Sequence, residues 1–164
     1  MKILIFSDSH ASLGFMRKCI TKLRPDCILH LGDYYDDGQI IAQENPQLRF
    51  YQVPGNCDRY RCPPDAPQVL LITLDGVKIY MTHGHNHHVK AGTGALVADA
   101  RRSGAHIALY GHTHSMECYR DADGLLVMNP GTCSYGGSVG VIGTENNQIK
   151  YAYLLKESEL EDTL

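Results

Sequence analysis

The sequence of 164 residues lacks the features that mark several common classes of protein. No stretch reaches the roughly 18 consecutive apolar residues that a membrane-spanning helix needs, so we expect no membrane partner. An excess of positive charge is also missing, because 15 Lys and Arg stand against 18 Asp and Glu and the net charge is −3. Nucleic-acid-binding proteins usually carry a basic surface, and this balance argues against nucleic acid as a partner.

The signals of a secreted protein and of a nucleotide triphosphatase are missing too. The apolar run 2–6 is too short for a signal peptide, and no small-residue cleavage site follows it. The six cysteines include no C-x2-C pair of the kind found in structural zinc sites, and we expect them to be reduced thiols. No Gly-x4-Gly-Lys-Ser/Thr phosphate-binding loop is present. These absences favour a cytoplasmic protein of another class.

Apolar runs and turn residues divide the chain into short strands and helices without an internal repeat or linker, so we treat residues 1–164 as one domain. The predicted strands cover residues 2–6, 27–31, 50–53, 68–74, 77–82 and 107–110, and the predicted helices cover 12–24 and 90–103. Turns are predicted at Asp75-Gly76, Asp123-Gly124, Gly136-Gly137 and Asn146-Asn147. The first third predicts a parallel sheet, and the region from Met116 onward predicts antiparallel pieces joined by turns. The fold class is therefore α/β.

Five of the predicted strands are each followed by side chains that can bind a metal or transfer a proton. These side chains are Asp8, His10, Asp33, Asn56, His83, His112 and His114. The carboxyl ends of the strands are the edge at which open α/β sheets bind ligands. One such loop alone would be weak evidence, because an isolated Gly-Asp is usually a turn. The same placement after five strands predicts that the seven side chains form one site.

Carboxylate, imidazole and amide ligands suit divalent transition-metal ions. Seven side chains exceed what one ion with an open position can use, so they suit two ions that share one carboxylate. We expect Mn²⁺ first, with Ni²⁺, Fe²⁺, Zn²⁺ and Co²⁺ as alternatives. Two divalent ions bring a charge of +4 and the two aspartates −2, so the site would stay positive and attract anions. A water or hydroxide that bridges the ions would then attack a phosphate ester in line.

At these residues the sequence resembles the calcineurin-like metallophosphoesterases. The motifs that carry the resemblance are Asp8-x-His10, Gly32-Asp33, Gly55-Asn56-Cys57-Asp58, His83-Gly84 and Gly111-His112-Thr113-His114. The Gly-Asn-Cys-Asp motif and the turn Asn129-Pro130-Gly131 are similar to the small prokaryotic YfcE-like phosphodiesterase branch. The resemblance implies a four-layer αββα sandwich of two mixed β-sheets flanked by helices.

The resemblance also implies a role for each matching residue. The first metal ion would be held by Asp8, His10, Asp33 and His114. Asp33 would bridge to the second ion, which Asn56, His83 and His112 complete. Asp58 would orient a ligand or the substrate.

Two residues depart from the family pattern, and several others have a plain structural interpretation. Ala11 stands where the family usually has Gly, and Cys57 stands where relatives that cleave monoesters carry a histidine that assists the leaving group. His85 could contact the substrate or supply a proton, or it could be a loop histidine bound by water. We interpret His30 as a core histidine, His87 and His88 as solvated, and residues 34–38 as a turn in which Asp36 and Asp37 could also orient a ligand.

These observations lead to the hypothesis of a two-metal phosphodiesterase that hydrolyses a small soluble phosphate ester, with Asn56, Cys57, Asp58 and His85 next to the reaction. Two alternatives stay open. The same fold serves as a non-catalytic or weakly catalytic protein-interaction scaffold in the retromer subunit that resembles this family. A metal-dependent nuclease is the other alternative, and the missing basic groove argues against it. A homo-oligomer is compatible with the sequence.

Overall fold

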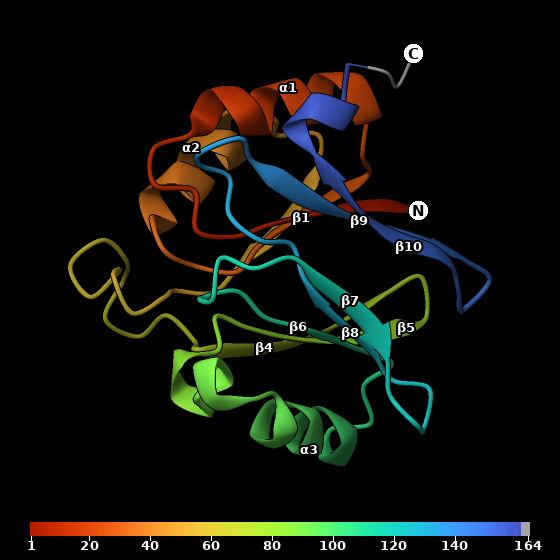
Figure 1. The fold of residues 1–164 in the computed structure, drawn as a ribbon. Coiled ribbons are helices and arrows are strands. Elements are labelled where there is room, and N and C mark those ends of the chain that lie inside the picture. Colours follow the sequence, from red (N-terminus) through yellow and green to blue (C-terminus); the bar gives the residue numbers. More distant parts are fainter. Residues whose placement is uncertain (162–164) are drawn as a thin grey trace.

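Two five-stranded β-sheets lie face to face between helices in the computed structural model, which describes residues 1–161 (Figure 1). The first sheet has the order β10-β9-β1-β2-β3, and the second has the order β4-β5-β6-β8-β7. The first sheet contains β1 (Lys2–Phe6), β2 (Cys27–His30), β3 (Arg49–Gln52), β9 (Ser138–Glu145) and β10 (Gln148–Lys156). The second contains β4 (Val69–Leu74), β5 (Val77–Thr82), β6 (Ile107–Leu109), β7 (Glu117–Arg120) and β8 (Leu126–Asn129). This arrangement confirms the predicted sandwich.

Helices cover the outer face of each sheet (Figure 1). The helices α1 (Leu13–Leu23) and α2 (Tyr35–Glu44) lie on the first sheet, and α3 (Gly94–Arg102) lies on the second. The described residues also form three short 3₁₀ helices. These are η1 (His85–His87) and η2 (Val89–Ala91), between β5 and α3, and η3 (Glu157–Glu159), after β10. None of the helices among the described residues is both long and apolar enough to cross a membrane.

The side chains of β1 explain why this sheet is buried on both faces. Alternate residues of a strand point to opposite faces. Ile3 and Ile5 therefore join the core between the two sheets, while Leu4 and Phe6 pack under α1. All four side chains are fully buried, as the continuous apolar run predicts.

The parallel strands bring the predicted site residues to one edge of the sandwich. In the first sheet β1, β2 and β3 are parallel, and in the second β5, β6 and β8 are parallel. The loops at their carboxyl ends contact one another across the two sheets. The N–H of His112, which follows β6, donates to the Oδ2 atom of Asp8, which follows β1, over 3.1 Å.

The structure corrects the sequence-based prediction of four segments. Residues 34–38 form the start of α2 and not a turn. The predicted helix 90–103 is divided into η2 and α3, because Gly92 has a φ of 137° that a right-handed helix does not allow. Strand β8 is parallel to β6, whereas we expected only antiparallel pieces after Met116. Gly136 lies in a turn as predicted, but this turn belongs to the connection from β8 in one sheet to β9 in the other and does not join paired strands.

Candidate metal centre

All seven predicted ligand residues come together at the carboxyl edge of the two sheets. Two groups of side chains bring their ligand atoms within 4.8 Å of one another: Asp8 with His10 and His114, and Asp8 with Asp33 and His83. The other two residues adjoin His83. The Oδ1 atom of Asn56 lies 3.0 Å from His83 Nε2, and the ring of His112 lies 5.1 Å from the His83 ring. The strand-end pattern therefore predicted a real cluster.

The orientation of His83 directs its Nε2 atom toward oxygen atoms of the cluster. Its Nδ1 atom lies 2.8 Å from the carbonyl oxygen of Leu31, which can only accept a hydrogen bond. Nδ1 therefore donates to this carbonyl oxygen, and Nε2 is the ring atom that faces the cluster. Nε2 faces oxygens of Asn56 at 3.0 Å and Asp33 at 3.5 Å. An imidazole nitrogen, an amide oxygen and a carboxylate oxygen are all atoms that can ligate a divalent metal ion.

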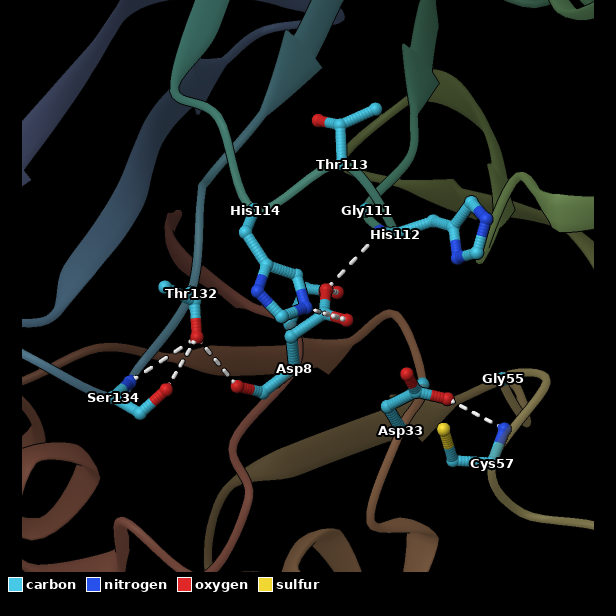
Figure 2. A network of polar contacts seen from close by, with 12 residues as sticks. Asp8, Asp33, Gly55, Cys57, Gly111, His112, Thr113, His114, Thr132 and Ser134 are labelled. Carbon is cyan, nitrogen blue, oxygen red and sulfur yellow. Dashed lines mark hydrogen bonds and ion pairs between the residues drawn. The ribbon is translucent and has the colours of Figure 1, made fainter. Parts of the chain in front are cut away.

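Asp8 and His10 offer further unsatisfied atoms at the same place. Asp8 Oδ1 and His10 Nε2 are buried and have no hydrogen-bond partner. The closest basic atom to Asp8 Oδ1 is Nε2 of His114, at 3.1 Å (Figure 2). Buried polar atoms without partners are costly, and they are expected where an ion or a ligand binds. The donor set and its unsatisfied atoms therefore fit divalent metal ions.

Asp8 and not Asp33 is the carboxylate that both groups of ligand atoms share. The other Asp8 oxygen, Oδ2, accepts hydrogen bonds from the hydroxyl of Ser7 at 2.5 Å and from the N–H of His112. Asp33 Oδ1 accepts one from the N–H of Cys57 at 2.9 Å (Figure 2). Each carboxylate thus has one oxygen held by the protein and one directed toward the cluster.

The protonation states of the cluster favour metal binding. Burial alone would raise the pKa of Asp33, but His83 and the Cys57 N–H hold that pKa below its ordinary value. Burial lowers the pKa of His112, and the neighbouring His83 lowers it further. Ionised carboxylates and neutral imidazoles are the forms that ligate metals.

The buried carboxylate of Asp58 joins two of the ligand-bearing loops. Its Oδ2 atom accepts from the backbone N–H groups of Asp33 and Gly55, each at 2.8 Å, and its Oδ1 atom accepts from that of Tyr35 at 2.9 Å. Asp33 follows β2, and Gly55 follows β3. Asp58 thereby holds the Asp33 loop against the loop that carries Asn56.

A second buried network supports the Asp8–His10 loop, and the sequence analysis assigned only part of it. His30 accepts from the N–H of Gly32 at Nδ1 and lies 3.0 Å from the Ser9 hydroxyl at Nε2. Ser9 donates in turn to Asp37 at 2.7 Å, and Asp37 also accepts from the N–H of Ala11. Burial lowers the pKa of His30 to about 4, so it stays neutral. The interpretation of His30 as a core histidine is confirmed.

Asp37 has a positioning role that the interpretation of residues 34–38 as a turn did not predict. Its carboxylate is buried and holds the loop between β1 and α1 from the first turn of α2. A signal was available in the sequence, because two acidic residues in succession are typical of the first turn of a helix. The connection from β8 to β9 supports the same loop, since the Thr132 hydroxyl donates to the Asp8 carbonyl oxygen at 2.8 Å (Figure 2).

Cys57 and His85 lie beside the cluster. The Cys57 thiol is exposed, and burial of part of the residue together with the Asp33 carboxylate raises its pKa. The His85 ring centroid lies 5.5 Å from that of His83, and its Nδ1 atom is buried without a partner. Burial lowers the pKa of His85, with a further contribution from His83.

His87 is not solvated, which corrects the sequence-based interpretation. Its Nε2 atom lies 3.0 Å from the Tyr80 hydroxyl and 3.0 Å from Asp99 Oδ2. Only 8% of its surface is exposed, because it anchors the loop after β5 to α3. His88 is exposed, as expected.

Comparison with known proteins gives a consistent result. The family model of the calcineurin-like phosphoesterase superfamily domain matches residues 1–147. The phosphodiesterase MJ0936 of Methanocaldococcus jannaschii is 28% identical over 169 residues, which cover 92% of this chain and 97% of that protein.

Solved structures share the fold at lower identity. A predicted phosphoesterase of Streptococcus pneumoniae has a TM-score of 0.76 and 23% identity, covering 96% of this chain and 90% of that one. Vps29 of Entamoeba histolytica, in complex with Zn²⁺, has a TM-score of 0.73 and 18% identity, covering 95% and 98%.

Proposed function

The chain belongs to the calcineurin-like phosphoesterase superfamily, and from this premise we propose that it is a dinuclear-metal phosphodiesterase acting on a small soluble phosphate ester. The observation that carries the proposal is the pair of buried atoms without a hydrogen-bond partner, Asp8 Oδ1 and His10 Nε2, within the group of ligand residues at the carboxyl edge. Buried polar atoms without partners are costly, and bound cations would satisfy them.

The assignment of ligands follows the family motif. Asp8, His10 and His114 would hold one ion, Asn56, His83 and His112 would hold the other, and Asp33 would be shared by both. When bound, two such ions lower the pKa of a water and stabilise negative charge on phosphoryl oxygens. Mn²⁺ is the proposed native ion, and Ni²⁺, Fe²⁺, Zn²⁺ and Co²⁺ have the same ligand preferences.

The protein side chains around the ions orient the reactants. Asp58 keeps Asp33 in place through the backbone, and His85 contacts the phosphate or its leaving group. Cys57 offers a weakly acidic thiol and not an imidazolium, so it donates no strong hydrogen bond to a departing alkoxide. We therefore assign diesters with good leaving groups as better substrates than alkyl monoesters.

The scaffold alternative shares the fold but gains no specific support. The Vps29 of Entamoeba histolytica that was solved with Zn²⁺ has this architecture, so the architecture alone does not separate the two functions. The seven proposed ligand side chains, which lie together at one edge, and the 28% identity to a protein named phosphodiesterase support catalysis. The net charge of −3 disfavours the nuclease alternative. Six free thiols suit the reducing cytoplasm.

Metal analysis combined with an activity screen tests the proposal. The protein is stripped with a chelator, and its metal content and its hydrolysis of bis(p-nitrophenyl) phosphate and p-nitrophenyl phosphate are measured after addition of each ion. We expect two ions per chain, activity only with transition metals, and faster cleavage of the diester. Full activity in the metal-free protein, or no activity with any ion on either ester, would contradict the proposed function.

A further inference from the structure

A small cavity adjoins the candidate metal centre on the side of the loop between β3 and β4. Its volume is about 250 Å³, and Asn56 and His85 lie in its wall. Both residues also face the metal cluster, since Asn56 is 3.0 Å from His83 Nε2 and the His85 ring lies 6.2 Å from the His112 ring. At roughly 30 Å³ for each atom of water-like size, the cavity has room for about eight non-hydrogen atoms. It therefore has room for one short ester group of a substrate.

The acidic groups around this cavity are already bound to protein partners. Asp58 is the only carboxylate in its wall, and both of its oxygens accept backbone hydrogen bonds. Asp36 pairs with Arg61 at 3.0 Å, away from the wall. The Asp58 oxygens are therefore occupied by backbone donors and do not pair with a basic group of the wall.

The basic group of the cavity is not bound in this way. The Arg59 guanidinium has no acidic partner among residues 1–161, and it lies 5.4 Å from the centre of the Tyr60 ring. Gln68 also lines the wall. The cavity thus offers a permanent positive charge next to the phosphate site.

We propose that this cavity selects the second ester group of the substrate, and that it selects one that carries its own negative charge. The inference rests on the proposed function and refines it. The substrate class is a phosphodiester in which a carboxylate or a further phosphate lies within a few atoms of the ester oxygen. The scissile phosphate occupies the metal centre, and the second anionic group reaches Arg59 through the cavity. A cationic or bulky group in that position is disfavoured by Arg59 and by the volume.

Three p-nitrophenyl phosphodiesters of matched length test the charge of this group. Their second alcohols are 3-hydroxypropanoate, which is anionic, 1-propanol, which is neutral, and choline, which is cationic. We expect the anionic diester to have a kcat/KM about fivefold above that of the neutral one, the upper range for an exposed ion pair. The choline diester should be the poorest. The preference should appear mainly in KM and weaken in 0.5 M salt, because the charge contact lies away from the reacting atoms.

Arg59→Gln should remove the preference for the anionic diester and leave the rate on the propyl diester within about twofold. Arg59→Lys should restore part of the preference, because it keeps the charge. The matched control is Arg49→Gln, which makes the same change in charge at the exposed amino end of β3, at the opposite edge of the sheet. A wild type that cleaves the propyl diester at least as well, or an Arg59→Gln variant that loses all three activities equally, would overturn the inference. Absence of metal-dependent cleavage of every diester would instead overturn the proposed function itself.

Discussion

The two edges of the sandwich differ in the residues that adopt an unusual backbone conformation. Both contain residues with positive φ, a conformation that L-amino acids with a Cβ atom seldom adopt. In the two hairpin turns these residues are Asp75, Gly76, Asn146 and Asn147, which are the types that tolerate it. At the site edge they include five of the seven proposed ligands, of which Asp8 and Asp33 are again of a tolerant type and His10, His112 and His114 are not. Ala11 and Tyr34 have positive φ there as well.

The difference shows at which positions the protein keeps a strained backbone conformation. The hairpin turns adopt their conformation because of local sequence and the ladder of the adjoining strands. The site loops are held by contacts from distant parts of the chain. Asp8 donates its N–H to the Gly32 carbonyl at 2.9 Å, and Asp33 donates its N–H to Asp58. Strained residues cost about 1–3 kcal/mol each and persist only where surrounding contacts determine them. At this edge the surrounding contacts bring the proposed metal ligands together.

Replacing the carboxylates of the site edge should give the largest difference between the two edges. Asp33→Asn should lose both ions, because a bridge belongs to two coordination spheres, while Asp8→Asn should retain one. Either change should lower kcat/KM on the order of 10³-fold, whereas Asp75→Asn in the hairpin should have no effect. Metal content by mass spectrometry and diester kinetics provide the measurement. Retention of one ion by Asp33→Asn and of none by Asp8→Asn would assign the bridge to Asp8, which the shared geometry allows.

Removing a carboxylate that positions the loops should give the next largest difference. Asp58→Asn replaces a carboxyl group that accepts from three backbone N–H groups with an amide, and we expect it to lower the free energy of unfolding by about 2–4 kcal/mol. Asp123→Asn, in the exposed turn at the opposite edge, should change it by less than about 0.5 kcal/mol. Urea unfolding in the presence of chelator measures both without a contribution from metal. Equal changes would mean that Asp58 has no special role in holding the site loops.

Relieving strain at single residues should give the smallest difference, with the opposite sign. Ala11 has a φ of 66°, so Ala11→Gly should raise the free energy of unfolding by about 0.5–1 kcal/mol and keep the N–H donated to Asp37. Asn147→Gly in the hairpin should raise it by less, because Asn already tolerates its φ of 64°. Thermal and urea unfolding of the two variants would show the order. A larger gain at Asn147 would contradict the view that strain is concentrated at the site.

Much of the fold was predictable because its signals are local. The apolar run of β1 and the turn Asp75-Gly76 appear within a few residues, and both are confirmed. The missed segments depend on more distant partners. Helix α2 begins at Tyr35, a residue type of low helix propensity, and it is stabilised by packing of Ile41 on the first sheet. The helix predicted over 90–103 is interrupted in the structure at a single residue, Gly92.

The sequence by itself determined the chemical nature of the site, because ligand types and their position after a strand are local properties of the chain. Only the tertiary structure decided which atoms converge and which are satisfied. The hydrogen bond between His112 and Asp8 joins residues 104 positions apart, and the burial of Asp37 and His87 depends on neighbours from other elements. Such contacts form when two sheets pack with a common carboxyl edge, and no short pattern of residues encodes them.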